Sequence, residues 1–401
     1  QEIYQNMLPA WEATKEEDRH YTLRKQGIEA MRAYLDGTYS VFGLGKTLQT
    51  PTTEAVSERP AAEPEVSEPE PPIAEAETSE IEPALPAEEK AVLTAPQPKR
   101  ERMRFAPLYP EIPTGQRHDF HITDRELGVG SKAEKYASNV AAIRTLQAVE
   151  SENRLATPEE QETLSCYVGW GGLANAFSDK AAGWENEYQE LKALLTDEEY
   201  KAAMRSTITA YYTEPELIRY MYRALERFGF EGGPDRRILD PGMGTGNFYS
   251  VLPEQYQGTK LYGVELDSIT GRIAKQLYPE ADISVMGYEA AKFEDNSFDV
   301  ILGNIPFNSV KIYDRRYNEL NPYIHDYFFI KSLDLAKPGG IIAFITSKGI
   351  LDRKDESLRE YIARRAEFIG AIRLPNTAFK ALAGTEVTAD IVFLKKRAAP
   401  M

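Results

Sequence analysis

The sequence has a single cysteine, only four histidines, and no apolar run long enough to cross a bilayer. One cysteine, Cys166, excludes an intramolecular disulfide and a cysteine-rich metal site. No cleavable signal pattern opens the chain, so we expect a cytoplasmic protein without a membrane partner. The first residue is Gln1 rather than Met, and we expect the chain to be an excised portion of a longer polypeptide.

Acidic residues outnumber basic ones. The 47 lysines and arginines face 63 acidic residues, which gives a net charge of −16 and is unfavourable for a nucleic-acid binder. Residues 51–100, however, hold 12 acidic and 4 basic side chains, so half of the excess lies in one eighth of the chain. Local basic patches can exist on the rest, and the charge does not exclude DNA binding.

The composition divides the chain into four parts. Residues 1–47 have strong helix formers at helical spacing, which predicts an N-terminal helical segment. Residues 48–98 are rich in Pro, Glu and Ala and nearly free of aromatics, which predicts a disordered linker. Residues 99–205 predict a helical region packed on the final part, residues 206–401.

The final part alternates short apolar strands with amphipathic helices, which is typical of a doubly wound α/β sheet. Seven strands are expected, within the segments RRILDPG, KLYGVEL, DISVMG, FDVILGN, GGIIAFITS, FIGAIRL and ADIVFLKK.

A glycine-rich loop follows the first of these strands, in ILDPGMGTGNF. Asp240 ends the strand, and Gly242, Gly244 and Gly246 precede a predicted helix start. Glycines there let the backbone approach a ligand closely, and free N–H groups can face a negative group. A loop of this kind is a weak signal by itself, because a plain strand-to-helix turn has the same pattern.

The second strand ends with Glu265, in YGVELD. A carboxylate at this position suits two ribose hydroxyls, whether of a dinucleotide or of S-adenosyl-L-methionine (SAM). The loop spacing is G-x-G-x-G rather than G-x-G-x-x-G, which favours SAM because SAM has no pyrophosphate to hold.

Upstream, YYTEPE begins a helix, with Thr213 and Glu216 in capping-box register. Beside a nucleotide loop, Tyr212 and Thr213 are candidates to close over the methionine end of the cofactor.

GNIPF follows the fourth strand, at the edge of the sheet where ligands bind in open α/β folds. The side-chain oxygen of Asn304 and the carbonyl of Ile305 could both accept hydrogen bonds from an exocyclic amino group and localise its lone pair. Pro306 fixes the turn without a competing N–H, and Phe307 offers a stacking face for a base extruded from the duplex.

This stretch resembles the [DNS]-P-P-[YFW] motif of amino-group methyltransferases, except that Ile305 replaces the first proline, which we expect to loosen the turn. Longer stretches such as FHITDRELGVG and GAIRLPNTAFKALAGTEVTADIVFLKKR resemble the N6-adenine methylase domain of large proteins of bacterial conjugative elements and phages. The resemblance implies a seven-stranded SAM-dependent methyltransferase sheet with an antiparallel last strand, SAM as cofactor, DNA as partner, and a helicase-like domain in the full-length protein.

The catalytic set expected from this resemblance comprises Asn304, Ile305, Pro306 and Phe307. The expected cofactor-binding set comprises Tyr212, Thr213, Asp240, Pro241, Gly242, Met243, Gly244, Gly246, Phe248, Glu265, Leu266 and Glu289. No metal is expected. Two alternatives to DNA adenine methylation stay open: methylation of a protein glutamine, and a silent methylase fold that binds SAM or DNA without turnover.

Overall fold

The computed structural model describes residues 105–122, 130–207, 213–307, 310–375 and 388–401. The expected helical segment 1–47, the expected linker 48–98 and Tyr212 therefore lie outside the described residues.

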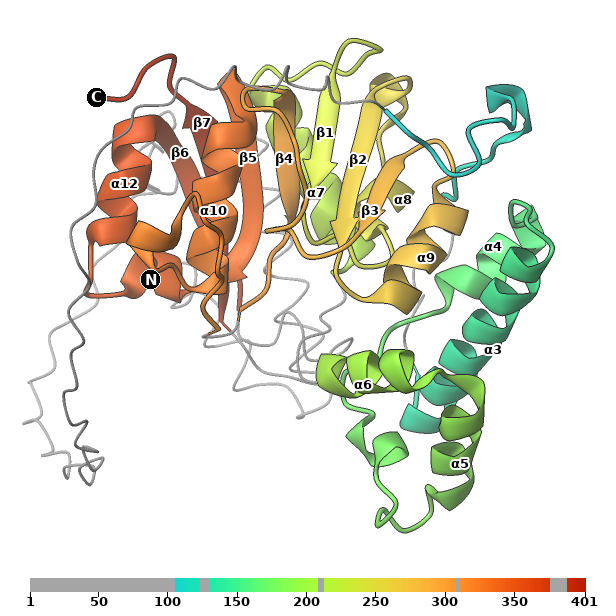
Figure 1. The fold of residues 1–401 in the computed structure, drawn as a ribbon. Helices are drawn as coiled ribbons and strands as arrows, with labels where there is room; N and C mark the ends of the chain where they lie inside the picture. Colours follow the sequence, from blue (N-terminus) through green and yellow to red (C-terminus); the bar gives the residue numbers. More distant parts are fainter. Residues whose placement is uncertain (1–104, 123–129, 208–212, 308–309, 376–387) are drawn as a thin grey trace, which may run out of the picture. The chain divides into compact units, whose positions relative to one another are not determined.

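The centre of the fold is a seven-stranded sheet in the order β3-β2-β1-β4-β5-β7-β6 (Figure 1). Its strands are β1 Arg237–Asp240, β2 Lys260–Glu265, β3 Asp282–Val285, β4 Phe298–Asn304, β5 Ala336–Ser347, β6 Ala366–Arg373 and β7 Ala389–Lys396. All seven expected strands are confirmed. The first five pair in parallel, whereas β7 pairs antiparallel with both β5 and β6, so the antiparallel last strand is confirmed too.

Both faces of this sheet are covered, which is why its strands are apolar at consecutive positions rather than at alternate ones. Successive residues of β4 show this pattern: Val300 and Leu302 belong to one hydrophobic core, and Ile301 between them belongs to the other. Helix α7, Pro215–Arg227, contributes to the first core. Helices α10, Ile324–Leu335, and α12, Ser357–Arg365, contribute to the second.

Shorter and peripheral elements complete the described chain. The other α-helices are α3 Lys132–Ser151, α4 Pro158–Ser165, α5 Glu185–Leu194, α6 Asp197–Ser206, α8 Asn247–Ser250, α9 Ser268–Leu277 and α11 Gly349–Asp352. The 3-10 turns are η1 Thr114–Gln116, η2 Ala174–Phe177, η3 Glu254–Tyr256 and η4 Asn318–Leu320.

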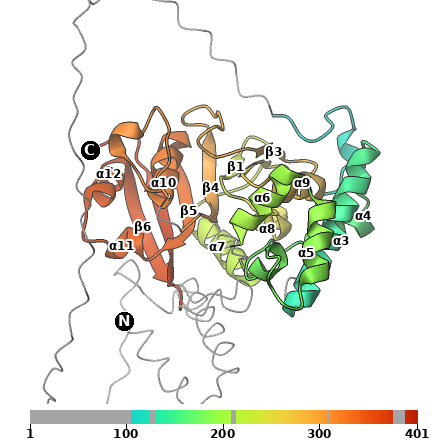
Figure 2. The same ribbon diagram turned by 60° about the horizontal axis from the view of Figure 1, so that its bottom comes forward.

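Helices α3, α4 and α6 contact the sheet region through α9, and α5 packs on α6 (Figures 1 and 2). Arg272 of α9 donates hydrogen bonds to Glu150 of α3 at 2.8 Å and to Glu199 of α6 at 2.6 Å. Gln161 of α4 is buried and donates to the carbonyl of Gln276 at 2.9 Å. A guanidinium shared by two carboxylates and a buried amide thus tie these helices to α9.

The connections between strands decide where a ligand can bind. From β1 the chain passes to β2 on one side, whereas from β4 it passes to β5 on the other, although β1 and β4 are neighbours. In open α/β sheets the crevice outside such a switch point is the ligand site. Asp240, Glu265 and Asn304 end β1, β2 and β4, so all three lie at this edge.

Candidate active site at the carboxyl edge of the sheet

The glycine loop between β1 and α8 has the backbone that its sequence predicts. Gly244 and Gly246 have φ values of +57° and +89°, which L side chains rarely adopt. At Gly246 there is also no space for a side chain, because an added Cβ would lie 2.3 Å from the Tyr278 ring. Glycine is required at this position on both counts.

Asp240 is buried under this loop at 1% exposure. Its carboxylate accepts a hydrogen bond from the N–H of Gly242 at 3.2 Å, and its own N–H donates to the hydroxyl of Tyr249 at 3.1 Å. Burial, reinforced by the nearby charge of Glu265, raises the pKa of Asp240 to about 8. The Asp240 side chain thus holds the glycine loop through the N–H of Gly242.

Gly303 of β4 makes that placement possible. A Cβ at this residue would lie 2.5 Å from Oδ1 of Asp240, so the aspartate occupies the space that a side chain on the neighbouring strand would fill. Sequence reasoning missed Gly303 and Tyr249. A glycine inside an otherwise apolar strand was the available signal for the first, since such glycines often mark a close approach.

Glu265 links the second strand to the same loop. One carboxylate oxygen accepts from the N–H of Gly244 at 2.9 Å, and the other from the N–H of Asp267 at 2.8 Å. Burial raises the pKa of Glu265 to about 7, and the charge of Asp267 acts in the same direction. The structure therefore connects the acidic strand tip directly to the glycine loop.

Thr213 and Asn304 meet across 91 residues of sequence. The amide Nδ2 of Asn304 donates to the hydroxyl of buried Thr213 at 3.0 Å. The expected capping box between Thr213 and Glu216 is wrong, because helix α7 begins at Pro215 with Glu214 as its N-cap and without a side-chain capping bond. Proline at the first helical position sets the boundary, and the threonine is left to bind Asn304.

The other end of the Asn304 amide is different. Its Oδ1 is buried and has no hydrogen-bond partner among the residues that the structure describes. A buried acceptor without a partner is costly, on the order of 1–3 kcal/mol, and such groups concentrate where a ligand supplies the missing donor. This oxygen is therefore the strongest candidate for contact with an acceptor substrate.

The residues after Asn304 are held in place by a backbone hydrogen bond and by packing. Ile305 is 2% exposed, and its N–H donates to the carbonyl of Ile345 at 3.0 Å, which continues the β4–β5 ladder. The expectation that isoleucine loosens the turn is therefore wrong: a proline here could not donate this hydrogen bond. Phe307 is partly buried against the first core. Pro306 Cδ lies 4.0 Å from a Cβ built on Gly242, so the motif adjoins the glycine loop.

The remaining predicted cofactor residues are placed differently from one another. Met243 is buried and packs against Gly263, while its N–H donates to the carbonyl of Val264 at 3.0 Å. Leu266, by contrast, is 75% exposed at the end of β2.

Pro241 and Phe248 are buried, and the carbonyl of Phe248 accepts from the Tyr222 hydroxyl at 2.8 Å. Glu289 is exposed, whereas the neighbouring Tyr288 is buried and bonded to Ser332 at 3.1 Å. Of these four residues, Glu289 alone presents its side chain to solvent.

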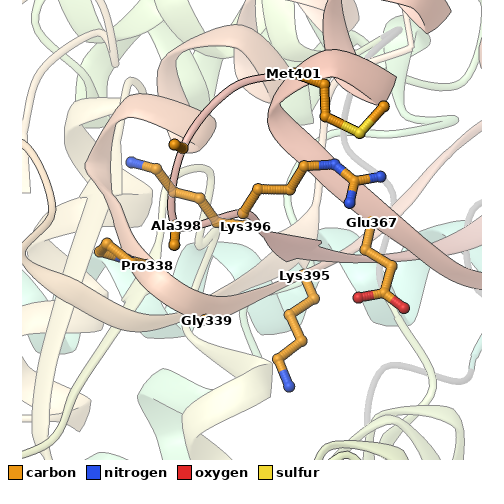
Figure 3. A pocket seen from close by; sticks show the side chains of 9 residues that line it. Pro338, Gly339, Glu367, Lys395, Lys396, Ala398 and Met401 are labelled. Carbon is orange, nitrogen blue, oxygen red and sulfur yellow. The ribbon is translucent and has the colours of Figure 1, made fainter.

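A pocket lies at the opposite edge of the sheet, where β5 begins and β7 ends (Figure 3). Its lining includes Gly339, Glu367, Lys395, Lys396 and Arg397. Because β4 and β5 are parallel and Asn304 pairs with Ile345, the pocket lies a strand's length from the motif. It is separate from the candidate active site.

Among the described residues no helix combines the length and apolar character needed to cross a membrane. In the same residues no group of three or more His, Cys, Asp or Glu side chains is arranged to hold a metal ion.

Comparisons with known proteins give relatives of the same kind. Defense against restriction protein B of Escherichia phage P1 is 31% identical over 272 residues, which cover 66% of this chain and 10% of that protein. Modification methylase CviBIII of Paramecium bursaria Chlorella virus NC1A is 29% identical over 120 residues, which cover 29% of this chain and 32% of that protein. The chain thus spans between a tenth and a third of the length of these relatives.

Among solved structures, the type I restriction-modification system methyltransferase subunit from Streptococcus thermophilus aligns with a TM-score of 0.39 and 17% identity, covering 64% of this chain and 66% of that one. A family model described as N-6 DNA Methylase matches residues 198–400, which is just over half of the chain. The chain therefore belongs to the N-6 DNA methylase family, and SAM is its methyl donor.

Proposed function

We propose that the chain methylates the N6 amino group of adenine in DNA. The observation that carries this proposal is the buried, unpartnered Oδ1 of Asn304, at the end of β4 and beside the glycine loop. An exocyclic amino group supplies the N–H donor that this oxygen lacks within the described residues.

The residues around the motif suit the weak nucleophilicity of that amino group. Its lone pair is delocalised into the ring, and two acceptors on its hydrogens localise the pair toward the incoming methyl group. Asn304 Oδ1 is one acceptor, and the carbonyl of Ile305 is the other. Thr213 holds the amide in the orientation that leaves Oδ1 available, and the N–H of Ile305 is already engaged by Ile345. Most of the rate enhancement then comes from positioning.

Phe307 has a different part in the proposal. We assign its ring as the stacking face for an adenine extruded from the duplex, whose unstacking costs a few kcal/mol. Pro306 gives the turn a fixed φ and packs beside Gly242, which keeps the stacking face next to the cofactor loop.

Three observations at the glycine loop and at the end of β2 support SAM binding there. Gly244 and Gly246 bring the backbone close to a ligand, Glu265 offers a carboxylate for ribose hydroxyls, and Leu266 exposes an apolar side chain that an adenine ring would cover. SAM supplies an electrophilic methyl group on a sulfonium when bound. We assign Asp240, Pro241, Gly242, Met243 and Phe248 to shaping this loop, Glu289 to the adenine side, and Tyr212 with Thr213 to the methionine side.

The wider context is also part of the proposal. The phage P1 relative is about ten times the length of the matched region, which supports a chain that acts within a larger protein of a mobile element. We propose that the full-length protein joins this domain to a helicase-like domain and works in the cytoplasm.

The test is methyl transfer from isotopically labelled SAM to mixed-sequence duplex DNA, followed by digestion to nucleosides. N6-methyladenine as the labelled product supports the proposal. Label in protein glutamine, or in cytosine, would refute the substrate. SAM binding by calorimetry without transfer to any of these would point to the silent fold instead.

A further inference from the structure

We propose that residues 310–323, which lie between the Asn304–Phe307 motif and α10, form the surface that holds the duplex around the target base; we call this segment the β4–α10 segment. Tyr313 contacts a nucleotide by stacking, and Lys311 and Arg315 contact phosphates. The inference rests on the proposed DNA substrate and names the residues that bind it.

The first observation is an unusual concentration of exposed apolar side chains. Nine large hydrophobic residues are exposed among the described residues, and four of them lie in this segment of 14 residues. They are Tyr313 at 80%, Val310 at 54%, Leu320 at 46% and Tyr323 at 37% exposure. Clustered exposed apolar surface marks an interaction site more often than scattered single residues do.

The second observation is that the backbone of the segment is firmly held. The N–H of Ile324 donates to the carbonyl of Val310 at 2.7 Å, and Lys311 and Tyr323 form a β-bridge. The hydroxyl of Tyr327 donates to Asp314 at 2.5 Å. The apolar side chains are therefore presented by an anchored scaffold.

A comparison of tyrosines strengthens this point. Tyr317 is 5% exposed and donates to Asp334 at 2.8 Å, and Arg316 pairs with Asp295 at 2.7 Å. Four residues before Tyr317, Tyr313 is almost fully exposed. Tyr317 therefore anchors the segment to the fold. The Tyr313 ring is not packed in the fold, so it does not serve the segment as an anchor.

The third observation is charge. Lys311 is exposed, with its Nζ 5.3 Å from the centre of the Tyr323 ring. Arg315 is exposed and makes no ion pair with any described residue. Asp314 is bonded to Tyr327, which leaves Glu319 as the exposed acid of the segment. The helical region 130–207, by contrast, holds 13 acidic and 8 basic side chains.

These features together indicate what kind of molecule binds the β4–α10 segment. Aromatic stacking combined with nearby cations is the means by which proteins hold unpaired or distorted nucleic acid. An apolar protein partner would not need Lys311 and Arg315, and the segment begins three residues after Phe307, the residue proposed to stack on the flipped base. Duplex DNA next to that base is therefore the occupant we infer.

The experiment measures the affinity of the whole chain for a fluorescein-labelled 30-base-pair duplex of mixed sequence, by anisotropy over a salt series. Tyr313→Ala should weaken binding by about 5- to 100-fold, the range seen for loss of one stacked base. Tyr313→Phe should bind like the wild type. Replacing both Lys311 and Arg315 by Ala should lower the slope of log Kd against log salt by about two.

Matched controls are Phe368→Ala and Arg364→Ala, which alter an exposed aromatic on β6 and an exposed arginine on α12. Both should leave the affinity and the salt slope unchanged. The unfolding midpoint and the SAM affinity should be equal in all variants, since Tyr313 contributes little buried surface.

The outcomes separate this inference from the proposed reaction. Loss of binding in the Tyr313 variant with no adenine methylation by the wild type would support the surface and refute the reaction. Adenine methylation with unchanged DNA affinity in both segment variants would refute the surface alone. A wild type that binds no duplex, or a Tyr313→Ala change that converts a dimer to a monomer in sedimentation, would overturn the inference.

Discussion

The two halves of the sheet's carboxyl edge differ in how far their buried polar side chains are hydrogen-bonded. In the half built from β1 and β2, the carboxylates of Asp240 and Glu265 accept hydrogen bonds from the backbone N–H groups of Gly242 and Gly244 in the loop and of Asp267 after β2. In the half built from β4 and β5, Asn304 keeps a buried oxygen without a partner in the described chain, and exposed side chains follow it. The first half is held by its own hydrogen bonds, whereas in the reaction proposed above the substrate would supply the donor that the second half lacks.

This difference has a physical cause. A cofactor that is the same in every turnover can be met by a rigid loop, and preorganisation reduces the ordering cost of binding. In the proposed reaction the base leaves its duplex before it binds. The proposed acceptor, Asn304, is held by its hydrogen bond to Thr213, and its Oδ1 has no partner in the described chain. Four substitutions test how independent the two halves are.

The largest effect is expected at Asn304. Asn304→Ala removes the acceptor and should lower the rate of methyl transfer by about 10²- to 10³-fold, as for other groups that act on the reacting centre. SAM affinity by calorimetry should fall far less than the rate, because Asn304 is linked to the proposed cofactor residues only through its hydrogen bond to Thr213. Asn304→Asp keeps an acceptor oxygen and should retain more activity. Loss of SAM binding together with transfer would show that Asn304 is structural.

Glu265 tests the other half. Glu265→Ala should weaken SAM binding by about 10- to 100-fold, since a hydrogen bond to a charged group contributes about 1.5–3 kcal/mol. Glu254→Ala, which changes an exposed glutamate on η3, is the matched control and should bind normally. An affinity unchanged by Glu265→Ala would remove this residue from the ribose site.

Asp240 makes the preorganised half sensitive to pH. Its pKa is raised from 3.8 to about 8, so between these values the unfolded chain releases a proton that the folded chain keeps. The contribution of Asp240 to the free energy of unfolding should therefore fall as pH rises from about 4 to about 8. Asp240→Asn keeps an oxygen for Gly242 and does not titrate, so over this interval its free energy of unfolding should rise relative to that of the wild type, by about 1.4 kcal/mol for each pH unit.

Denaturant unfolding of both proteins at pH 5 and pH 8 measures that gain. Asp179→Asn, at an exposed aspartate, controls for the loss of one negative charge. Parallel pH curves for Asp240→Asn and the wild type would contradict the raised pKa.

The smallest effect is expected at Leu266. Leu266→Ala should lower SAM affinity by about 3- to 10-fold, because an adenine ring would bury part of a side chain that contributes roughly 1 kcal/mol when half covered. The unfolding free energy should not change, since the side chain is 75% exposed without ligand. A lowered stability with normal SAM affinity would mean that Leu266 packs within the fold.

The sequence was sufficient for the strands and for the side of the sheet on which the motifs lie. Strand runs such as FDVILGN are apolar at consecutive positions, and the residues that end them must gather at one edge. Contacts between distant residues could not be predicted in this way. The hydrogen bond from Asn304 to Thr213 joins parts of the chain 91 residues apart. The local sequence pattern instead predicted that Thr213 would form a capping box with Glu216.

The expected looseness at Ile305 failed for a related reason. A motif comparison shows that isoleucine replaces proline at residue 305, which adds a backbone N–H. It does not show that this N–H donates to the carbonyl of Ile345, which belongs to a strand 40 residues later. Which backbone groups pair across strands depends on register, and register is a property of the folded sheet.

Gly303 leaves free the space that the Asp240 carboxylate occupies beneath the glycine loop. A single methyl group at this residue would overlap that carboxylate, so any other side chain would displace the aspartate that binds the loop. A randomised codon at position 303 should therefore return almost only glycine among active clones, even though the residue touches neither donor nor acceptor in the proposed reaction. Variation that broadens substrate choice would have to arise in the loops above the sheet.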